Sequence, residues 1–135
     1  MAHPQNMESV LQAVQRKVTP HMNESLTHPY IADEVRLALF QMHPSKSPRL
    51  DGMSHFFFQK YWHIVGNDVT EAILFVFRSA HMLKKMNHTH IVLIPKKKDP
   101  TDYRPISLSN VVSQIISKVI VNRLKLILPN VIFDS

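Results

Sequence analysis

Glycine is nearly absent from this chain, since Gly52 and Gly66 are the only two among 135 residues. Loops that wrap a nucleotide phosphate need several closely spaced glycines, because the backbone turns tightly and approaches the phosphate without a Cβ in the way. Neither the G-x-G-x-x-G turn nor the G-x-x-x-x-G-K-[ST] loop can be written anywhere in the sequence. The commonest nucleotide-binding folds are therefore excluded.

Cysteine is absent as well, which excludes a disulfide framework, a thiolate zinc site and a cysteine nucleophile. With 44% hydrophobic and 19% charged residues, the composition is that of one small globular domain. No apolar stretch is long enough to span a bilayer, and residues 1–10 contain no secretory signal. We therefore expect an intracellular protein, nuclear or cytoplasmic, with no membrane partner.

The positive charge is concentrated in the second half of the chain. Residues 1–67 carry six basic and five acidic side chains, whereas residues 68–135 carry ten basic and five acidic ones. Such a charge distribution favours a polyanionic partner, because each neutralised phosphate releases condensed counterions. A solvated basic face with no partner is the alternative explanation.

Apolar residues at helical spacing predict four helices before residue 80. They cover residues 7–18, 33–42, 54–66 and a stretch that starts at 68. An aromatic group at 56–62 falls in the third helix, where helical spacing favours a core role over base stacking.

Local signals predict where these helices begin and end. Thr19-Pro20 is expected to end the first helix, because proline restricts the residue before it. Ser54 is the expected N-cap of the third helix, and Gly66 its expected stop. Asp68-Val-Thr-Glu71 has the form of a capping box that starts the fourth. The stretch 23–29 is polar and contains a proline, and the stretch 43–52, with two prolines and Gly52, is expected to be a loop.

The residue composition changes at Thr89-His-Ile-Val-Leu-Ile94, a segment that is rich in β-branched residues and is followed by Pro95. This pattern predicts a strand. A polar loop at 96–101 and a second extended run at 103–108 complete a β-hairpin over residues 89–108. Pro105 places the second strand at a sheet edge or bulge, because proline donates no ladder hydrogen bond.

A long helix is predicted after the hairpin, with Ser109 or Asn110 as its cap and Pro129 as its end. Its predicted apolar face consists of Val112, Ile115, Ile116, Val119, Ile120, Leu124, Ile127 and Leu128. The predicted fold class is α+β and mostly helical: helices, then a basic β-hairpin, then a long C-terminal helix.

Several linked motifs resemble the reverse transcriptases of non-LTR (LINE-type) retrotransposons, those of plant elements most closely. The motifs are Leu39-Phe-Gln-Met-His-Pro-Ser-Lys-Ser-Pro-Arg-Leu-Asp-Gly-Met53, Phe57-Phe-Gln-Lys-Tyr-Trp-His-Ile-Val-Gly66, Ile91-Val-Leu-Ile-Pro-Lys-Lys-Lys98, Asp102-Tyr-Arg-Pro-Ile-Ser-Leu-Ser-Asn110 and Ile116-Ser-Lys-Val-Ile-Val-Asn-Arg-Leu124. The likeness covers residues 18–135, which would form a partial reverse transcriptase domain, and residues 1–17 would be an N-terminal leader. It implies the pre-fingers and fingers region of a right-hand polymerase, without palm or thumb.

The resemblance also implies roles for the basic residues. Lys96 and Arg104 would contact the nucleotide triphosphate, and Arg suits this role because its planar fork matches phosphate oxygens. The expected contacts to the nucleic-acid backbone are Lys46, Arg49, Lys97, Lys98, Lys118, Arg123 and Lys125. The implied partner is an RNA template or an RNA/DNA duplex.

No catalytic residue is assigned, because polymerases of this family hold two divalent ions on palm aspartates and the sequence has no Asp-Asp pair. The chain stops at Asp134-Ser135, before the family's palm would begin. We expect no cofactor bound by this fragment, with Mg²⁺ required only by the complete enzyme and a deoxynucleoside triphosphate as a partner of the complete enzyme. We also expect no polymerase activity from this chain alone.

Three other hypotheses remain open from the sequence. The chain could be a non-enzymatic RNA- or DNA-binding module that uses the basic hairpin. It could also be a product without function, because fingers surface made for a palm would face water. The pair His88-Thr-His90 would present two imidazoles on one strand face, but no third ligand is evident, so no metal site is assigned.

Overall fold

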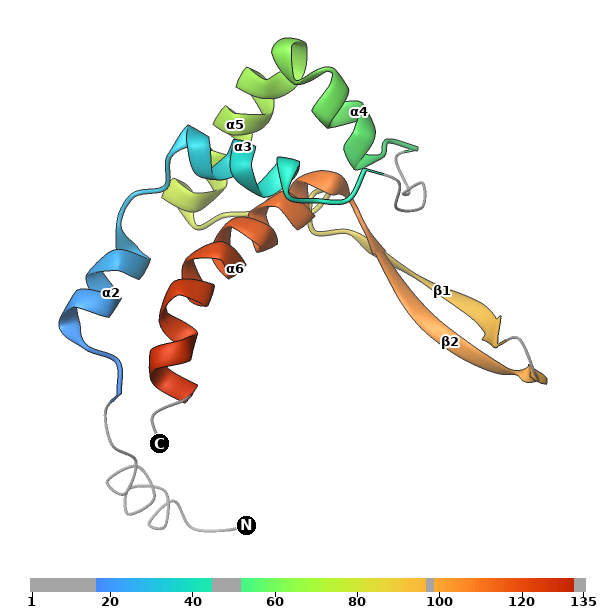
Figure 1. Ribbon diagram of the computed structural model, residues 1–135. Helices are drawn as coiled ribbons and strands as arrows, with labels where there is room; N and C mark the ends of the chain where they lie inside the picture. The colour runs from blue at the N-terminus through green and yellow to red at the C-terminus, as the bar shows by residue number, and fades with distance from the viewer. Residues whose placement is uncertain (1–16, 45–51, 97–98, 133–135) are drawn as a thin grey trace. The chain divides into compact units, whose positions relative to one another are not determined.

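The computed structural model describes residues 17–44, 52–96 and 99–132, with residues 96 and 99–102 described along the backbone. Within these residues the fold is α+β and mostly helical, and one antiparallel hairpin forms the sheet (Figure 1). The chain divides into two compact units: Met1–His28 with Arg123–Ser135, and Pro29–Asn122. The predicted fold class is confirmed at this level, and the 7–18 helix falls almost wholly outside the described residues.

The smaller unit brings helix α2 (Pro20–Thr27) against the C-terminal part of helix α6 (Val111–Ile132). The helix predicted to end at Thr19-Pro20 lies almost wholly outside the described residues, whereas α2 begins at this point and includes residues 23–27 of the polar, proline-containing stretch. Thr19 is instead an N-cap, and its Oγ1 accepts a hydrogen bond from the Met22 amide at 3.2 Å. Pro20 takes the first helical position, where its fixed φ suits the helix and its missing N–H has no partner to lose.

The larger unit has its core where helices α3 (Ala32–Phe40), α5 (Trp62–Ser79) and α6 meet. Leu39, Ile73 and Ile115 are fully buried there, one from each helix. The predicted helix at 33–42 and its buried stripe are confirmed. Burying these branched side chains stabilises the unit by roughly 1.5–3 kcal/mol for each one, because apolar surface leaves water.

Helix α4 (His55–Lys60) follows Ser54 as predicted, and α5 begins directly after Tyr61. Gly66 does not stop a helix, and Asp68-Val-Thr-Glu71 does not start one, because both lie inside α5. Gly66 is buried beneath the indole of Trp62 one turn earlier, which a Cβ would meet at 2.7 Å. The glycine therefore makes room for an aromatic ring within the helix.

Two glutamine side chains join the helices of the larger unit. The Gln59 amide donates to the carbonyls of Leu39 and Met42, at 2.9 Å each, and so joins α4 to the end of α3. Gln114 Oε1 lies 2.9 Å from Nε2 of the buried His55, in a hydrogen bond that links α6 to α4.

The aromatic group at 56–62 is divided between core and surface. Phe58 is buried, and Phe57 and Trp62 pack against the core, which confirms the core role predicted for them. Phe56 is exposed, and the Lys60 ammonium lies 5.7 Å from the centre of its ring.

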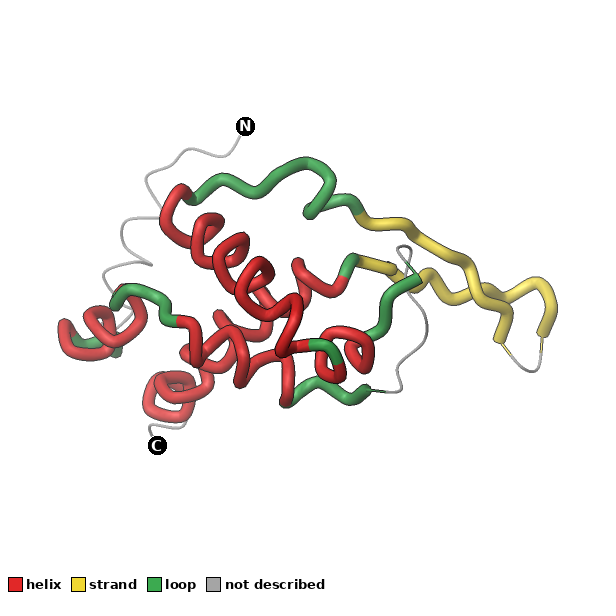
Figure 2. Tube along the Cα trace, turned by 90° about the horizontal axis from the view of Figure 1, so that it is seen from above, coloured by secondary structure: helices red, strands yellow, loops and turns green. Residues whose placement is uncertain are grey.

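Strands β1 (Thr89–Lys96) and β2 (Asp99–Ser109) form the predicted hairpin (Figure 2). Pairing is regular from Thr89 opposite Ser109 to Pro95 opposite Tyr103, after which the register shifts and Lys96 pairs with Asp99. The polar loop predicted over 96–101 is therefore shorter, because the second strand already begins at Asp99. In a two-stranded sheet both strands are edges, which accommodates Pro105.

Asn110 starts α6 as predicted, and its Oδ1 accepts a hydrogen bond from the Ser113 amide at 2.8 Å. Pro129 does not end the helix, which continues to Ile132. A proline this close to a C-terminus removes only one late hydrogen bond, so the helix can absorb it. Of the predicted apolar face, Ile115, Ile116, Val119 and Ile127 are buried, whereas Ile120 and Leu128 are 39% and 41% exposed.

Candidate nucleic-acid interface

The hairpin brings together the two residues predicted to contact a nucleotide. Arg104 lies on β2 opposite Ile94, and Lys96 ends β1 two residues further on. The Arg104 side chain is exposed. The register shift falls between Pro95 and Lys96, so a stretch of irregular pairing separates the two cations along the hairpin.

The other predicted contacts are spread over the chain. Lys118 and Lys125 lie on α6, half-buried and exposed respectively, and not on the hairpin. Lys46, Arg49, Lys97 and Lys98 lie outside the described residues.

Arg123, predicted to contact the nucleic-acid backbone, is buried within the smaller unit. Its side chain is only 9% exposed, and its Nη1 donates to the backbone carbonyls of Leu26 and His28 at the end of α2. A guanidinium bound in this way stabilises the helix terminus by satisfying carbonyls that lack intrahelical partners. Arg123 therefore holds the smaller unit together, and we do not count it in the interface.

The hairpin surface around Arg104 and toward the base of the hairpin is apolar and open to solvent. Ile91 is 70% exposed and Leu93 60% exposed on β1. Tyr103 and Ile106 on β2 are 51% and 41% exposed. The hairpin extends away from the helices of its unit, so neither face of its outer part is covered by them (Figure 1).

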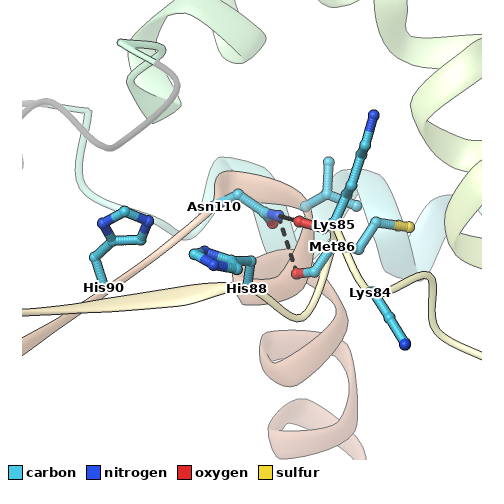
Figure 3. A pocket seen from close by; sticks show the side chains of 7 residues that line it. Lys84, Lys85, Met86, His88, His90 and Asn110 are labelled. Atoms are coloured by element: carbon cyan, nitrogen blue, oxygen red, sulfur yellow. Dashed lines mark hydrogen bonds between the residues drawn. The ribbon is translucent and has the colours of Figure 1, made fainter.

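A cavity of about 540 Å³ lies at the base of the hairpin, and sequence analysis did not identify it as a site. Its lining residues are Lys84, Lys85, Met86, His88, His90, Asn110 and Val112. Asn110 Nδ2 donates to the carbonyls of Met86 and Lys85, at 2.9 and 3.3 Å, and so ties the segment before β1 to the start of α6 (Figure 3).

The sequence contained one signal for this cavity. No Asp or Glu occurs in residues 72–98 or in residues 103–133, and the cavity takes all its lining residues from these two segments. Only the closing of the hairpin brings the two segments together, and spacing along the sequence does not show that.

His88 directly precedes β1 and His90 lies in it, and the centres of their rings are 4.6 Å apart. Across the described part of the chain, no group of three or more His, Asp or Glu side chains is placed to hold a metal ion. Among the described helices, none combines the length and apolar character needed to cross a membrane.

Comparison with known proteins relates this sequence to a transposon protein. The relative is the transposon TX1 uncharacterized 149 kDa protein of Xenopus laevis, which is 34% identical over 118 residues. The match covers 85% of this chain and 9% of the relative, so the chain spans a small part of that protein's length. No protein-family model matches the sequence. The transposon relationship is confirmed, whereas the reverse transcriptase and plant assignments stay predictions.

Proposed function

We propose that residues 18–135 are a segment of a LINE-type reverse transcriptase, an RNA-directed DNA polymerase, that leads into and includes its fingers. The observation that carries this proposal is the similarity to a transposon protein over 85% of the chain. The motifs at 91–98 and 102–110 support it, because residues 91–96 of the first and 102–109 of the second lie in the two strands of the hairpin.

In this proposal the hairpin binds a nucleotide triphosphate. Arg104 offers a planar pair of donors to phosphate oxygens, and Lys96 adds a compact positive charge from the other strand. Lys97 and Lys98 continue the run of lysines in the sequence and would contact the nucleic-acid backbone, where contacts set register without reading sequence.

We further propose that the chain binds nucleic acid without extending a primer. Two-metal phosphoryl transfer needs paired carboxylates, and no Asp-Asp pair occurs in the 135 residues. Mg²⁺ would therefore act in the complete enzyme and not on these residues. The test is primer extension on an RNA template by the purified chain with Mg²⁺, where any template-dependent product would contradict the proposal.

Binding is tested by titrating RNA and a primer-template over a salt series, with circular dichroism on the same sample to establish folding. The test variant replaces Lys96, Lys97, Lys98 and Arg104 by Ala. A matched variant removes the same charge elsewhere, by replacing the exposed residues Lys17, Arg36, Lys60 and Arg78. We expect the salt slope to fall by about 0.7 for each lost phosphate contact in the first variant only. Equal slopes in both variants would contradict a role for the hairpin.

A non-enzymatic RNA- or DNA-binding module is the second candidate, favoured by the excess of ten basic over five acidic residues in 68–135. The two candidates differ in triphosphate binding. Titration with a fluorescent deoxynucleoside triphosphate should show binding that Arg104→Ala removes and Arg78→Ala preserves if the chain derives from a polymerase. RNA binding without triphosphate binding would instead favour the module.

A further inference from the structure

We propose that the cavity at the base of the hairpin binds one nucleotide of a single-stranded nucleic acid. Lys84 and Lys85 would meet its phosphates, and its base would lie against Met86, Val112 and the two imidazole rings. The site shares no residue with the Lys96 and Arg104 contacts, so it does not rest on the polymerase proposal.

The charge around the cavity selects an anion. Two lysines and two histidines are among its lining residues, and no acid is. The two chain segments that supply the lining contain no Asp or Glu over residues 72–98 and 103–133. A site lined by one sign of charge raises the local concentration of the opposite ion, because nothing nearby cancels the field.

The lysines are placed for a chain of phosphates and not for one isolated phosphate. Both side chains are exposed, and they point in opposite directions from the turn that precedes β1 (Figure 3). A single phosphate could not be held between ammonium groups that diverge. A nucleotide within a strand has a phosphate on each side, so each lysine would meet one of them.

The interior of the cavity suits a base. Met86 and Val112 are half-buried and pack on the core of the larger unit, which gives the cavity an apolar floor. The His88 and His90 rings beside it are tilted by 57° to each other and are exposed. Histidine rings stack on unpaired bases, whereas a duplex keeps its bases inside the helix and cannot offer one. The cavity volume of about 540 Å³ lies within the range of small-ligand sites, about 300–1,000 Å³.

The walls are held in place before any ligand binds. Asn110 donates to the carbonyls of Lys85 and Met86 while its Oδ1 caps α6. The turn is closed by the Met86 amide, which donates to the Leu83 carbonyl at 2.9 Å. A preorganised wall favours binding, because less conformational freedom is lost when the ligand enters.

The experiment measures fluorescence anisotropy of a short labelled oligouridylate with the full chain at low salt. We expect Lys84→Ala/Lys85→Ala to weaken binding about tenfold or more, and the matched Lys60→Ala/Arg78→Ala to change it less than about twofold. His88→Ala/His90→Ala should weaken it about tenfold, since stacking on one base is worth about 1–3 kcal/mol. His63→Ala/His81→Ala is its control, because both of these histidines are exposed and lie outside the cavity. Circular dichroism checks that every variant is folded.

Two further ligands distinguish the contribution of the base to binding from that of the phosphates. An abasic oligonucleotide of equal length keeps the phosphates, so it should bind about tenfold more weakly to the unchanged chain and show no further loss with His88→Ala/His90→Ala. Uridine monophosphate should bind at least tenfold more weakly than the oligouridylate, because it lacks the second phosphate. Equal binding of the abasic strand, equal binding of the mononucleotide, or equal effects of a cavity variant and its control would each overturn the proposal. The triphosphate titration of Arg104→Ala is unaffected by these outcomes, so the two proposals fail separately.

Discussion

The helical core and the hairpin are built from the same kinds of residue but bury them very differently. Ile73 and Ile115 in the helices are fully buried, whereas Ile91 and Leu93 in the hairpin are 70% and 60% exposed. The helices place part of their apolar residues on faces that other helices cover, although Leu37, Ile64 and Phe75 are 55%, 64% and 59% exposed. The hairpin has four consecutive apolar residues at 91–94, which point to both faces of a two-stranded sheet.

This difference shows that apolar content alone does not predict where stability resides. Two strands without a covering layer are marginal in water, because few apolar contacts offset the lost chain entropy. The hairpin residues therefore add little to the free energy of unfolding. The same exposure leaves the hairpin surface available for contact with another molecule.

The largest expected effect compares one substitution in each region. Ile115→Ala removes a fully buried side chain and should lower the free energy of unfolding by about 2–5 kcal/mol. Ile91→Ala, at a position 70% exposed, should lower it by less than about 1 kcal/mol. Urea unfolding followed by circular dichroism measures both. Similar losses would show that the hairpin side chains are buried in solution, contrary to their exposure in the structure.

The sequence predicted the types and order of the elements better than their limits. The hairpin and the helices at 33–42 and after Asn110 follow from β-branched content, apolar periodicity and capping, which are local properties. Gly66 and Pro129 were each interpreted as a helix end, and each lies inside a helix, whereas Pro20 marks the start of α2. Proline and glycine have average preferences, which a contact such as that of the indole over Gly66 overrides.

The positive charge of the candidate site could be predicted from the sequence, whereas the cavity could not. The basic character of residues 84–104 is visible in the sequence, and Arg104 is exposed on the hairpin. The cavity joins residues 84–90 to residues 110 and 112, which are brought together only when the hairpin reverses the chain. Burial of Arg123 likewise depends on the position of α2, which was not predicted.

The junction between the hairpin and α6 offers a smaller effect, at Asn110. Asn110→Ala should lower the free energy of unfolding by about 1–2 kcal/mol, because it removes the cap on Ser113 and the amide donors to Met86 and Lys85. Asn110→Asp keeps an oxygen for the cap and loses only the donors.

Hydrogen exchange separates these two contributions. In Asn110→Asp, the amides of the first turn of α6 should keep their protection, while those of the turn before β1 should lose part of it. If Asn110→Asp lowered the protection of both segments, as Asn110→Ala should, the cap of α6 and the turn before β1 would form one cooperative unit. The hairpin would then share the stability of the helices more closely than its exposure indicates.

The smallest expected effect tests how tightly α5 is packed around Gly66. A Cβ at Gly66 would lie 2.7 and 2.8 Å from Cε2 and Cδ2 of the Trp62 indole, so Gly66→Ala must displace that ring. Overpacking costs about 1–3 kcal/mol and the gain in helix propensity is about 1 kcal/mol, so we expect a net loss of about 1 kcal/mol.

In a Trp62→Ala background the same substitution has no ring to displace, and it should raise the free energy of unfolding by about 1 kcal/mol. This change of sign distinguishes a glycine retained for packing from one that merely weakens the helix. Urea unfolding of the four proteins completes the double-mutant cycle, and the emission of the single tryptophan reports the ring's displacement in Gly66→Ala. A gain in both backgrounds would show that the indole moves aside freely, and this end of α5 would then be packed as loosely as the hairpin.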